Sequence, residues 1–183
     1  SIAINELREI YSMPIVGMEP AVKPAVEMNR ATGKRVLVCA TPLTLSMPKY
    51  YALVSRVDGN GIVDSLPLPE LVDYCERLVF DEEELAAYFR RKLEPFDLGR
   101  YGIIVLGCTH FLYYRDALRR VLPESIEIVD GNAGTVRRLA ALLTRYGISE
   151  NDGSGDVRFM CTGGDPAYIR KMGIALDRAR TLQ

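Results

Sequence analysis

The chain has 183 residues, of which 48% are hydrophobic and 26% are charged, a composition typical of a folded protein with a hydrophobic core. Lys and Arg number 23 against 24 Asp and Glu, and the resulting net charge of −1 gives no electrostatic reason to expect binding to nucleic acid or to an anionic membrane. No apolar stretch approaches the roughly 20 residues of a membrane-spanning helix, and no secretory signal is recognisable.

The four cysteines are widely spaced and form no C-x-x-C pair: Cys39, Cys75, Cys108 and Cys161. Without a secretory context, this spacing favours neither a disulfide framework nor a zinc site. We therefore expect reduced thiols, no metal and a cytoplasmic protein. Cys39 and Cys161 lie inside predicted strands and Cys75 inside a predicted helix, so a structural role is expected for these three.

The predicted elements begin with a helix that ends near residue 11. A short apolar strand is expected over residues 14–18, followed by a helix over 19–30. Pro20 falls in the first turn of that helix, where a missing N–H has little effect. Pro24 lies further inside and predicts either a kink or a later helix start.

Strands and helices continue to alternate along the rest of the chain. Strands are predicted over 34–40, 62–68, 101–106, 126–129 and 157–161, and helices over 45–57, 70–78, 81–93, 113–121, 135–146 and 166–178. This alternation predicts an α/β protein with a mainly parallel sheet flanked by helices. Ligands of such sheets bind beyond the carboxyl ends of the strands. Small polar clusters follow three predicted strands, at residues 41–44, 107–110 and 130–132.

Cys108 has the strongest indication of chemistry. It follows an apolar strand and a glycine and precedes a helix. Backbone N–H groups at such a corner carry partial positive charge, so we expect the pKa of the thiol to be lowered. His110, the only histidine, could exchange a proton with it. A buried core cysteine beside a turn histidine is the alternative, but a thiol, a hydroxyl and an imidazole at one strand end favour catalysis.

The other polar residues at strand ends each have two possible roles. Thr41 and Thr44 could bind a carboxylate or form a helix cap. Asp130 could bind an ammonium group or cap the helix that follows it. Glu76, on a predicted helix, is by composition alone an exposed acid. Neither G-x-x-x-x-G-K-[ST] nor G-x-G-x-x-G occurs, so no motif supports nucleotide binding.

Several segments resemble the aspartate/glutamate racemase superfamily, and in particular its glutamate-specific members. Residues 106–110 (L-G-C-T-H) match the most specific motif of the family. Weaker similarity is found over residues 15–21, 38–44, 68–76 and 156–163, so that the resemblance covers nearly the whole chain.

The resemblance implies a cofactor-independent enzyme that interconverts L- and D-glutamate for peptidoglycan synthesis. Members use two cysteines, one from each of two similar α/β domains, as bases on opposite faces of Cα, without pyridoxal phosphate or metal. The resemblance assigns six site residues: Cys108, His110 and Glu76 to catalysis, and Thr109, Thr44 and Thr41 to substrate binding.

The second cysteine of the family lies in a C-N-T-A-T-type motif, which this chain does not contain. We therefore expect an amino-terminally truncated fragment of a two-domain racemase with its first domain incomplete. Residues 1–14 would be a remnant of that domain, 15–130 the second domain, and 131–183 a return segment. Such a chain is expected to be inactive or to exchange the Cα proton on one face only.

Three alternatives stay open. The substrate could be aspartate or a hydantoin, since related racemases share the two-cysteine chemistry. The chain could be a non-catalytic binding or regulatory module derived from a racemase. It could also be a cysteine hydrolase, although no acidic orienting residue or oxyanion signature stands out beside Cys108. Glutamate is the expected partner, with a homodimer possible.

Overall fold

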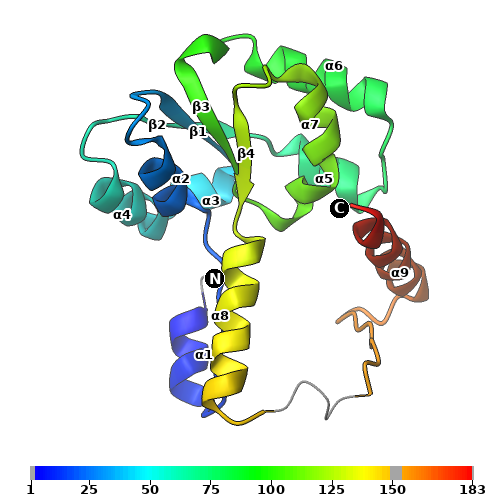
Figure 1. The fold of residues 1–183 in the computed structure, drawn as a ribbon. Coiled ribbons are helices and arrows are strands. Elements are labelled where there is room, and N and C mark those ends of the chain that lie inside the picture. The colour runs from blue at the N-terminus through cyan, green and yellow to red at the C-terminus, as the bar shows by residue number, and fades with distance from the viewer. Residues whose placement is uncertain (1–2, 149–153, 183) are drawn as a thin grey trace. The chain divides into compact units, whose positions relative to one another are not determined.

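The computed structural model describes residues 3–148 and 154–182, and these divide into two compact units (Figure 1). One, the sheet unit, consists of Met18–Asn132. The other, the helical unit, combines Ser1–Gly17 with Ala133–Gln183. Each unit is described below by itself.

The sheet unit is built on four parallel strands, which confirms the predicted α/β class. They are β1 (Arg35–Ala40), β2 (Val63–Pro67), β3 (Tyr101–Leu106) and β4 (Glu127–Asp130). Their order across the sheet is β2-β1-β3-β4. Alternate side chains of a strand face opposite sides of the sheet, so that Leu37 and Ile104 belong to one hydrophobic core while Val38 and Val105 belong to the other.

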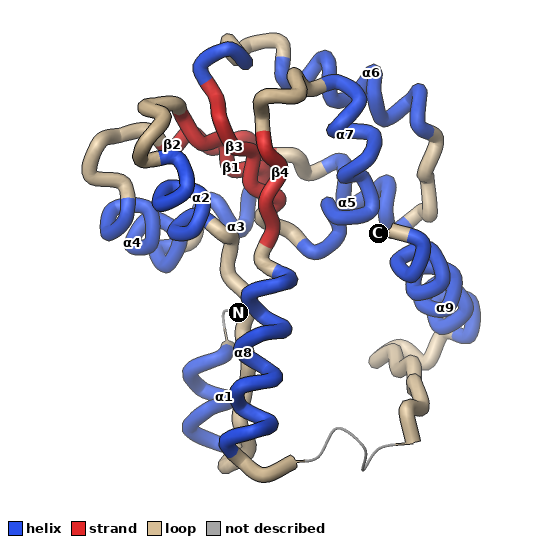
Figure 2. Tube along the Cα trace, in the orientation of Figure 1, coloured by secondary structure: helices blue, strands red, loops and turns tan. Residues whose placement is uncertain are grey.

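Helices cover both faces of this sheet (Figures 1 and 2). One face packs against α2 (Val22–Asn29) and α4 (Pro48–Val57). The other packs against α5 (Glu70–Glu76), α6 (Glu82–Leu93), the 3-10 helix η2 (Thr109–Tyr114) and α7 (Arg115–Val121). Two short helices, α3 (Pro42–Ser46) and η1 (Leu98–Arg100), complete the unit.

The helical unit contains α1 (Ile4–Ile10), most of α8 (Asn132–Arg145) and α9 (Pro166–Thr181). Two predicted strands were wrong: residues 14–18 and 157–161 have no regular secondary structure and belong to no sheet. β-branched residues favour extended backbone, but a strand forms only when a neighbour accepts its hydrogen bonds. The described residues of the helical unit form no strand that could be that neighbour.

Prolines set two helix boundaries that the sequence left uncertain. Helix α2 begins at Val22, so Pro24 falls in its first turn, where no intrahelical bond is lost. The helix predicted over 45–57 is divided into α3 and α4, each with a proline at its start. Met47, directly before Pro48, is extended, because the residue before a proline disfavours helical backbone.

An ion pair joins the strands at the amino end of the sheet. Asp64 on β2 accepts two hydrogen bonds from Arg35 on β1, at 2.5 and 2.7 Å, and a third from the Tyr101 hydroxyl at 2.7 Å. The Arg35 guanidinium, with help from Tyr101, holds the pKa of Asp64 below its ordinary value although burial opposes this. The pair therefore contributes stability only while Asp64 is ionised.

We expect Asp64→Asn to lower the free energy of unfolding by about 2 kcal/mol near neutral pH, as for a hydrogen-bonded charged group. Because the folded-state pKa is depressed, the contribution is complete above the ordinary aspartate pKa of about 3.9 and is lost as the pH falls through the folded value. Urea unfolding at a series of pH values measures it. The difference between wild type and variant should shrink on acidification; a constant difference would contradict this account.

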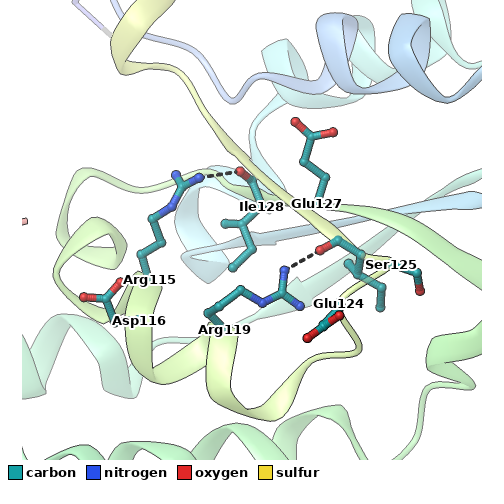
Figure 3. Close-up of a pocket in the computed structure, with 8 residues that line it drawn as sticks. Arg115, Asp116, Arg119, Glu124, Ser125, Glu127 and Ile128 are labelled. Atoms are coloured by element: carbon teal, nitrogen blue, oxygen red, sulfur yellow. Dashed lines mark hydrogen bonds between the residues drawn. The ribbon is translucent and has the colours of Figure 1, made fainter. Parts of the chain in front are cut away.

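Strand β4 forms the edge of the sheet, and two arginines of α7 occupy its outer side (Figure 3). Arg115 Nη2 donates to the Ile128 carbonyl at 2.9 Å, and Arg119 Nη1 donates to that of Ile126 at 2.5 Å. The two arginines are about one helical turn apart, a rise of about 5.4 Å. This is close to the roughly 6.6 Å between alternate residues of a strand, so each arginine reaches one of the two carbonyls. The arginines, with neighbouring acidic side chains, line a shallow surface pocket of about 470 Å³.

Outward-facing carbonyls on an edge strand are available for pairing with another chain, and charged side chains prevent it. We expect Arg119→Met to increase self-association with concentration in sedimentation velocity, relative to wild type. The matched control is Arg120→Met, which removes the same charge from α7 but breaks an ion pair with Glu82. Equal association of both variants would show that net charge, and not the edge, is responsible.

Candidate active site

The site lies where the order of the strands reverses. The chain passes from β1 to β2 on one side and then to β3 on the other, so a ligand crevice is expected beyond the carboxyl ends of β1 and β3. Cys39 pairs with Leu106, and the Gly107 N–H donates to the Cys39 carbonyl at 2.8 Å. A Cβ at Gly107 would lie 3.0 Å from that oxygen and 3.1 Å from the Ala40 side chain. Glycine therefore allows β3 to end directly beside β1.

A thiol, an imidazole and a carboxylate are in consecutive contact at this edge of the sheet. The Cys108 Sγ lies 3.7 Å from His110 Nδ1, and His110 Nε2 lies 3.2 Å from Glu76 Oε1. Cys108 precedes η2, His110 lies within η2, and Glu76 is the last residue of α5. The carboxylate can only accept, so the proton of a neutral imidazole belongs on Nε2 and leaves Nδ1 to accept from the thiol. This arrangement can move a proton to and from Cys108.

The expected lowering of the Cys108 pKa is wrong. Burial raises the pKa of this half-buried thiol, and the backbone N–H groups of His110 and Phe111 lower it only in part. The N–H groups are thus where the sequence places them, but removal of the thiolate from water outweighs them. Burial also raises the pKa of Cys39 to about 12 and that of Cys75 to about 11, as expected for structural thiols.

We expect iodoacetamide to modify Cys108 faster than Cys39 or Cys75, because only the thiolate reacts and Cys108 is the most accessible of the three. Its rate should rise through a midpoint above the ordinary thiol pKa of about 8.5. Peptide mass spectrometry after timed labelling separates the sites. A midpoint below neutral pH would mean that the N–H groups and not burial control this thiol.

The threonines lie beyond the carboxyl ends of both strands. Thr41 follows β1 and caps α3 by accepting from the Thr44 N–H at 3.2 Å, and the two hydroxyls are 3.0 Å apart. The capping role is therefore real, and both side chains remain partly exposed. Thr109 is the exposed first residue of η2, next to Cys108. A ligand in the crevice would meet hydroxyls from both strand ends.

Asp130 is a structural residue at the end of β4. One carboxylate oxygen accepts from the Asn132 N–H at 2.8 Å, and the other from Arg115 at 3.0 Å. Of its two possible roles, helix capping is the one that the structure shows. Sequence reasoning missed Glu19, whose backbone carbonyl lies beside Gly131. The Glu19 side chain forms a 2.6 Å ion pair with Lys49, a contact that no local pattern indicates.

Among the residues that the structure describes, no three His, Cys, Asp or Glu side chains gather where they could hold a metal ion. No helix in that part of the chain is long and apolar enough to cross a membrane. All four cysteines are free thiols.

A parallel sheet with a thiol, an imidazole and a carboxylate aligned at its switch point defines an α/β protein with an acid–base site. The family model described as Asp/Glu/Hydantoin racemase matches residues 1–139. The chain belongs to this racemase family.

Named relatives point to one group within the family. The chain is 55% identical over 164 residues to a glutamate racemase of Halothermothrix orenii, a match covering 89% of this chain and 64% of the relative. It is 37% identical to one of Lachnospira eligens, over 100% of this chain and 72% of that protein. The chain thus spans less than two thirds of the Halothermothrix relative.

A solved structure shares the fold. Escherichia coli glutamate racemase, crystallised with L-glutamate and the activator UDP-MurNAc-ala, superposes with a TM-score of 0.79 at 29% identity. The match covers 97% of this chain and 66% of that one.

Proposed function

We propose that this chain belongs to a glutamate racemase and supplies one of its two acid–base groups, Cys108. The observation that carries the proposal is the line from Cys108 through His110 to Glu76 at the switch point. The 55% identity to a glutamate racemase supports glutamate as the substrate over aspartate or a hydantoin.

In the proposed reaction the Cys108 thiolate removes the Cα proton of one glutamate enantiomer. The C–H electron pair stays on the substrate as a planar carbanion, and the sulfur becomes a thiol. A second acid on the opposite face then gives its proton to Cα and inverts the centre. His110 returns Cys108 to the thiolate by accepting its proton at Nδ1, and Glu76 stabilises the imidazolium until it releases a proton to solvent. The second acid regains its proton from solvent. The chemistry of this cycle uses no cofactor.

Substrate binding is assigned to the hydroxyls of Thr41, Thr44 and Thr109. Glutamate carries two carboxylates, and hydroxyl groups from two strand ends can donate to both of them. The pairing of β1 with β3 supports the assignment, because it brings the ends of these two strands side by side.

The domain organisation follows the same proposal. Residues 15–130 would be one racemase domain, supported by the compact unit Met18–Asn132. Residues 1–14 and 131–183 would belong to the other. The C-N-T-A-T-type motif of the second family cysteine does not occur in the chain, so the 183 residues alone are proposed to exchange the Cα proton on one face.

The cellular role would be the supply of D-glutamate for peptidoglycan by a cytoplasmic enzyme, with a homodimer as the possible assembly. Similarity to proteins named glutamate racemase supports D-glutamate as the product, while the location and the homodimer are proposed from the family resemblance alone. The E. coli relative was crystallised with an activator as well as with substrate, so regulation by a ligand is also proposed.

Substrate protection tests the proposal. Glutamate bound at the crevice should slow iodoacetamide modification of Cys108, while aspartate, one methylene shorter, should protect less. Cys161, which lies in the helical unit, is the internal control and should react at the same rate with or without ligand. Equal protection by aspartate would move the proposal to a related substrate, and protection by neither amino acid would remove its support.

A further inference from the structure

The two elements that carry Glu76 and His110 are also joined by a buried phenol, Tyr114. Tyr114 is the last residue of η2 and is 1% exposed. Its hydroxyl donates to the carbonyl of Val79 at 3.3 Å. The Cys75 side chain, in the last turn of α5, belongs to the same buried core as the Tyr114 ring. One side chain of η2 therefore packs with the last turn of α5 and is hydrogen-bonded to the segment that follows it.

The chain leaves α5 by a turn that brings Val79 to the phenol. The Leu78 N–H donates to the Cys75 carbonyl and the Val79 N–H to that of Tyr74, both at 2.9 Å. Leu78 has φ of 58°, the left-handed conformation that this kind of helix end normally gives to glycine. It is the one non-glycine residue with positive φ among those described. Such a conformation persists only where surrounding contacts hold it.

Two sets of bonds therefore connect the same pair of segments. His110 of η2 meets Glu76 of α5, and four residues later Tyr114 donates to Val79, three residues beyond Glu76. We infer that Tyr114 is a positioning residue whose hydroxyl fixes η2 against the end of α5 and thereby holds His110 on Glu76. The importance of Tyr114 for catalysis rests on the proposed function. Its effect on the position of the His110 imidazole is independent of that function.

The inference is specific to the phenol oxygen. The ring of Tyr114 belongs to the hydrophobic core, so Tyr114→Phe keeps the packing and removes only the hydroxyl. Without it, η2 loses a bond to the segment that follows α5, and His110 keeps only its contacts with Glu76 and Cys108. We expect the imidazole then to sample both tautomers, because Nε2 is held less firmly on the carboxylate.

The experiment is ¹⁵N NMR of the 183-residue chain labelled in histidine. His110 is the only histidine, so its two ring nitrogens give the only imidazole signals. At about pH 8.5, two units above the ordinary histidine pKa of about 6.5, the wild type should show two widely separated resonances, with the proton on Nε2. In Tyr114→Phe they should move toward each other, and Cα-proton exchange should fall about tenfold with little change in KM.

Tyr50→Phe is the matched control. Tyr50 is also a buried tyrosine, and its hydroxyl bonds Ser65 at 2.6 Å in the other core of the sheet unit. This variant should lose stability without moving the His110 signals. Cys75→Ala, which keeps the Tyr114 hydroxyl and removes a side chain of α5 from the core that surrounds its ring, should move them in the same direction by a smaller amount.

Wild-type His110 signals in Tyr114→Phe, or equal shifts in Tyr50→Phe, would overturn the inference. Collapse of Tyr114→Phe to an unfolded spectrum would leave Cys75→Ala to decide it, with unchanged signals counting against it. The nitrogen signals do not depend on turnover. Absence of exchange in wild type would therefore contradict the proposed function while the role of Tyr114 is still measured.

Discussion

In a Cys108→Ser variant we expect Cα-proton exchange of glutamate to fall by at least about a hundredfold, the lower range of a general base contribution. A serine hydroxyl has nearly the same size but is a far weaker acid than a thiol, so His110 cannot generate an equivalent base from it. The fold should be retained, because Cys108 is only partly buried and packs at the margin of the core. Loss of the Cα–H signal in heavy water, followed by ¹H NMR, measures the rate.

The matched control is Cys161→Ser, which makes the same chemical change in the helical unit. Its exchange rate should equal that of the wild type. Exchange by Cys108→Ser at more than a tenth of the wild-type rate would exclude Cys108 as the base, and an equal loss in both variants would indicate a general dependence on thiols.

The second large effect is expected at His110. His110→Ala should lower the exchange rate about a hundredfold, because the Cys108 proton then has no acceptor and burial favours the thiol. Glu76→Gln should lower it about tenfold, or about 1.4 kcal/mol of activation free energy. The amide keeps the shape of the side chain but cannot stabilise an imidazolium.

The double variant separates a relay from two independent contributions. In the proposed relay Glu76 acts through His110, so combining both substitutions should be no slower than His110→Ala alone. Multiplication of the two effects, to about a thousandfold, would show that Glu76 acts on the substrate by another route.

Much of the fold is predictable from local pattern. Residues 101–106 are a continuous apolar run between polar neighbours, and they form the central strand β3, which is covered on both faces. Residues 14–18 have an equally apolar sequence and form no strand. What separates the two is the presence of a hydrogen-bonding neighbour, which depends on the rest of the chain and not on the segment itself.

The site is predictable in part for a similar reason. Cys108 and His110 are two residues apart, so one local motif contains both. Glu76 is 34 residues from His110, and only the family resemblance pointed to it. The direction of the Cys108 pKa required the burial of the thiol, a property of the packed structure. Tyr114 had no sequence signal beyond being one of two adjacent tyrosines, because its partners lie at the end of another helix.

The central claim is that the Cys108 thiolate removes the Cα proton from one face of glutamate. The most direct measurement is incubation of the 183-residue chain in heavy water with each pure enantiomer, followed by ¹H NMR of the Cα–H signal and chiral analysis of the product. The account predicts that one enantiomer exchanges its Cα proton and keeps its configuration. Conversion of either enantiomer into the other would contradict exchange on one face, and the absence of exchange in both would contradict Cys108 as the base.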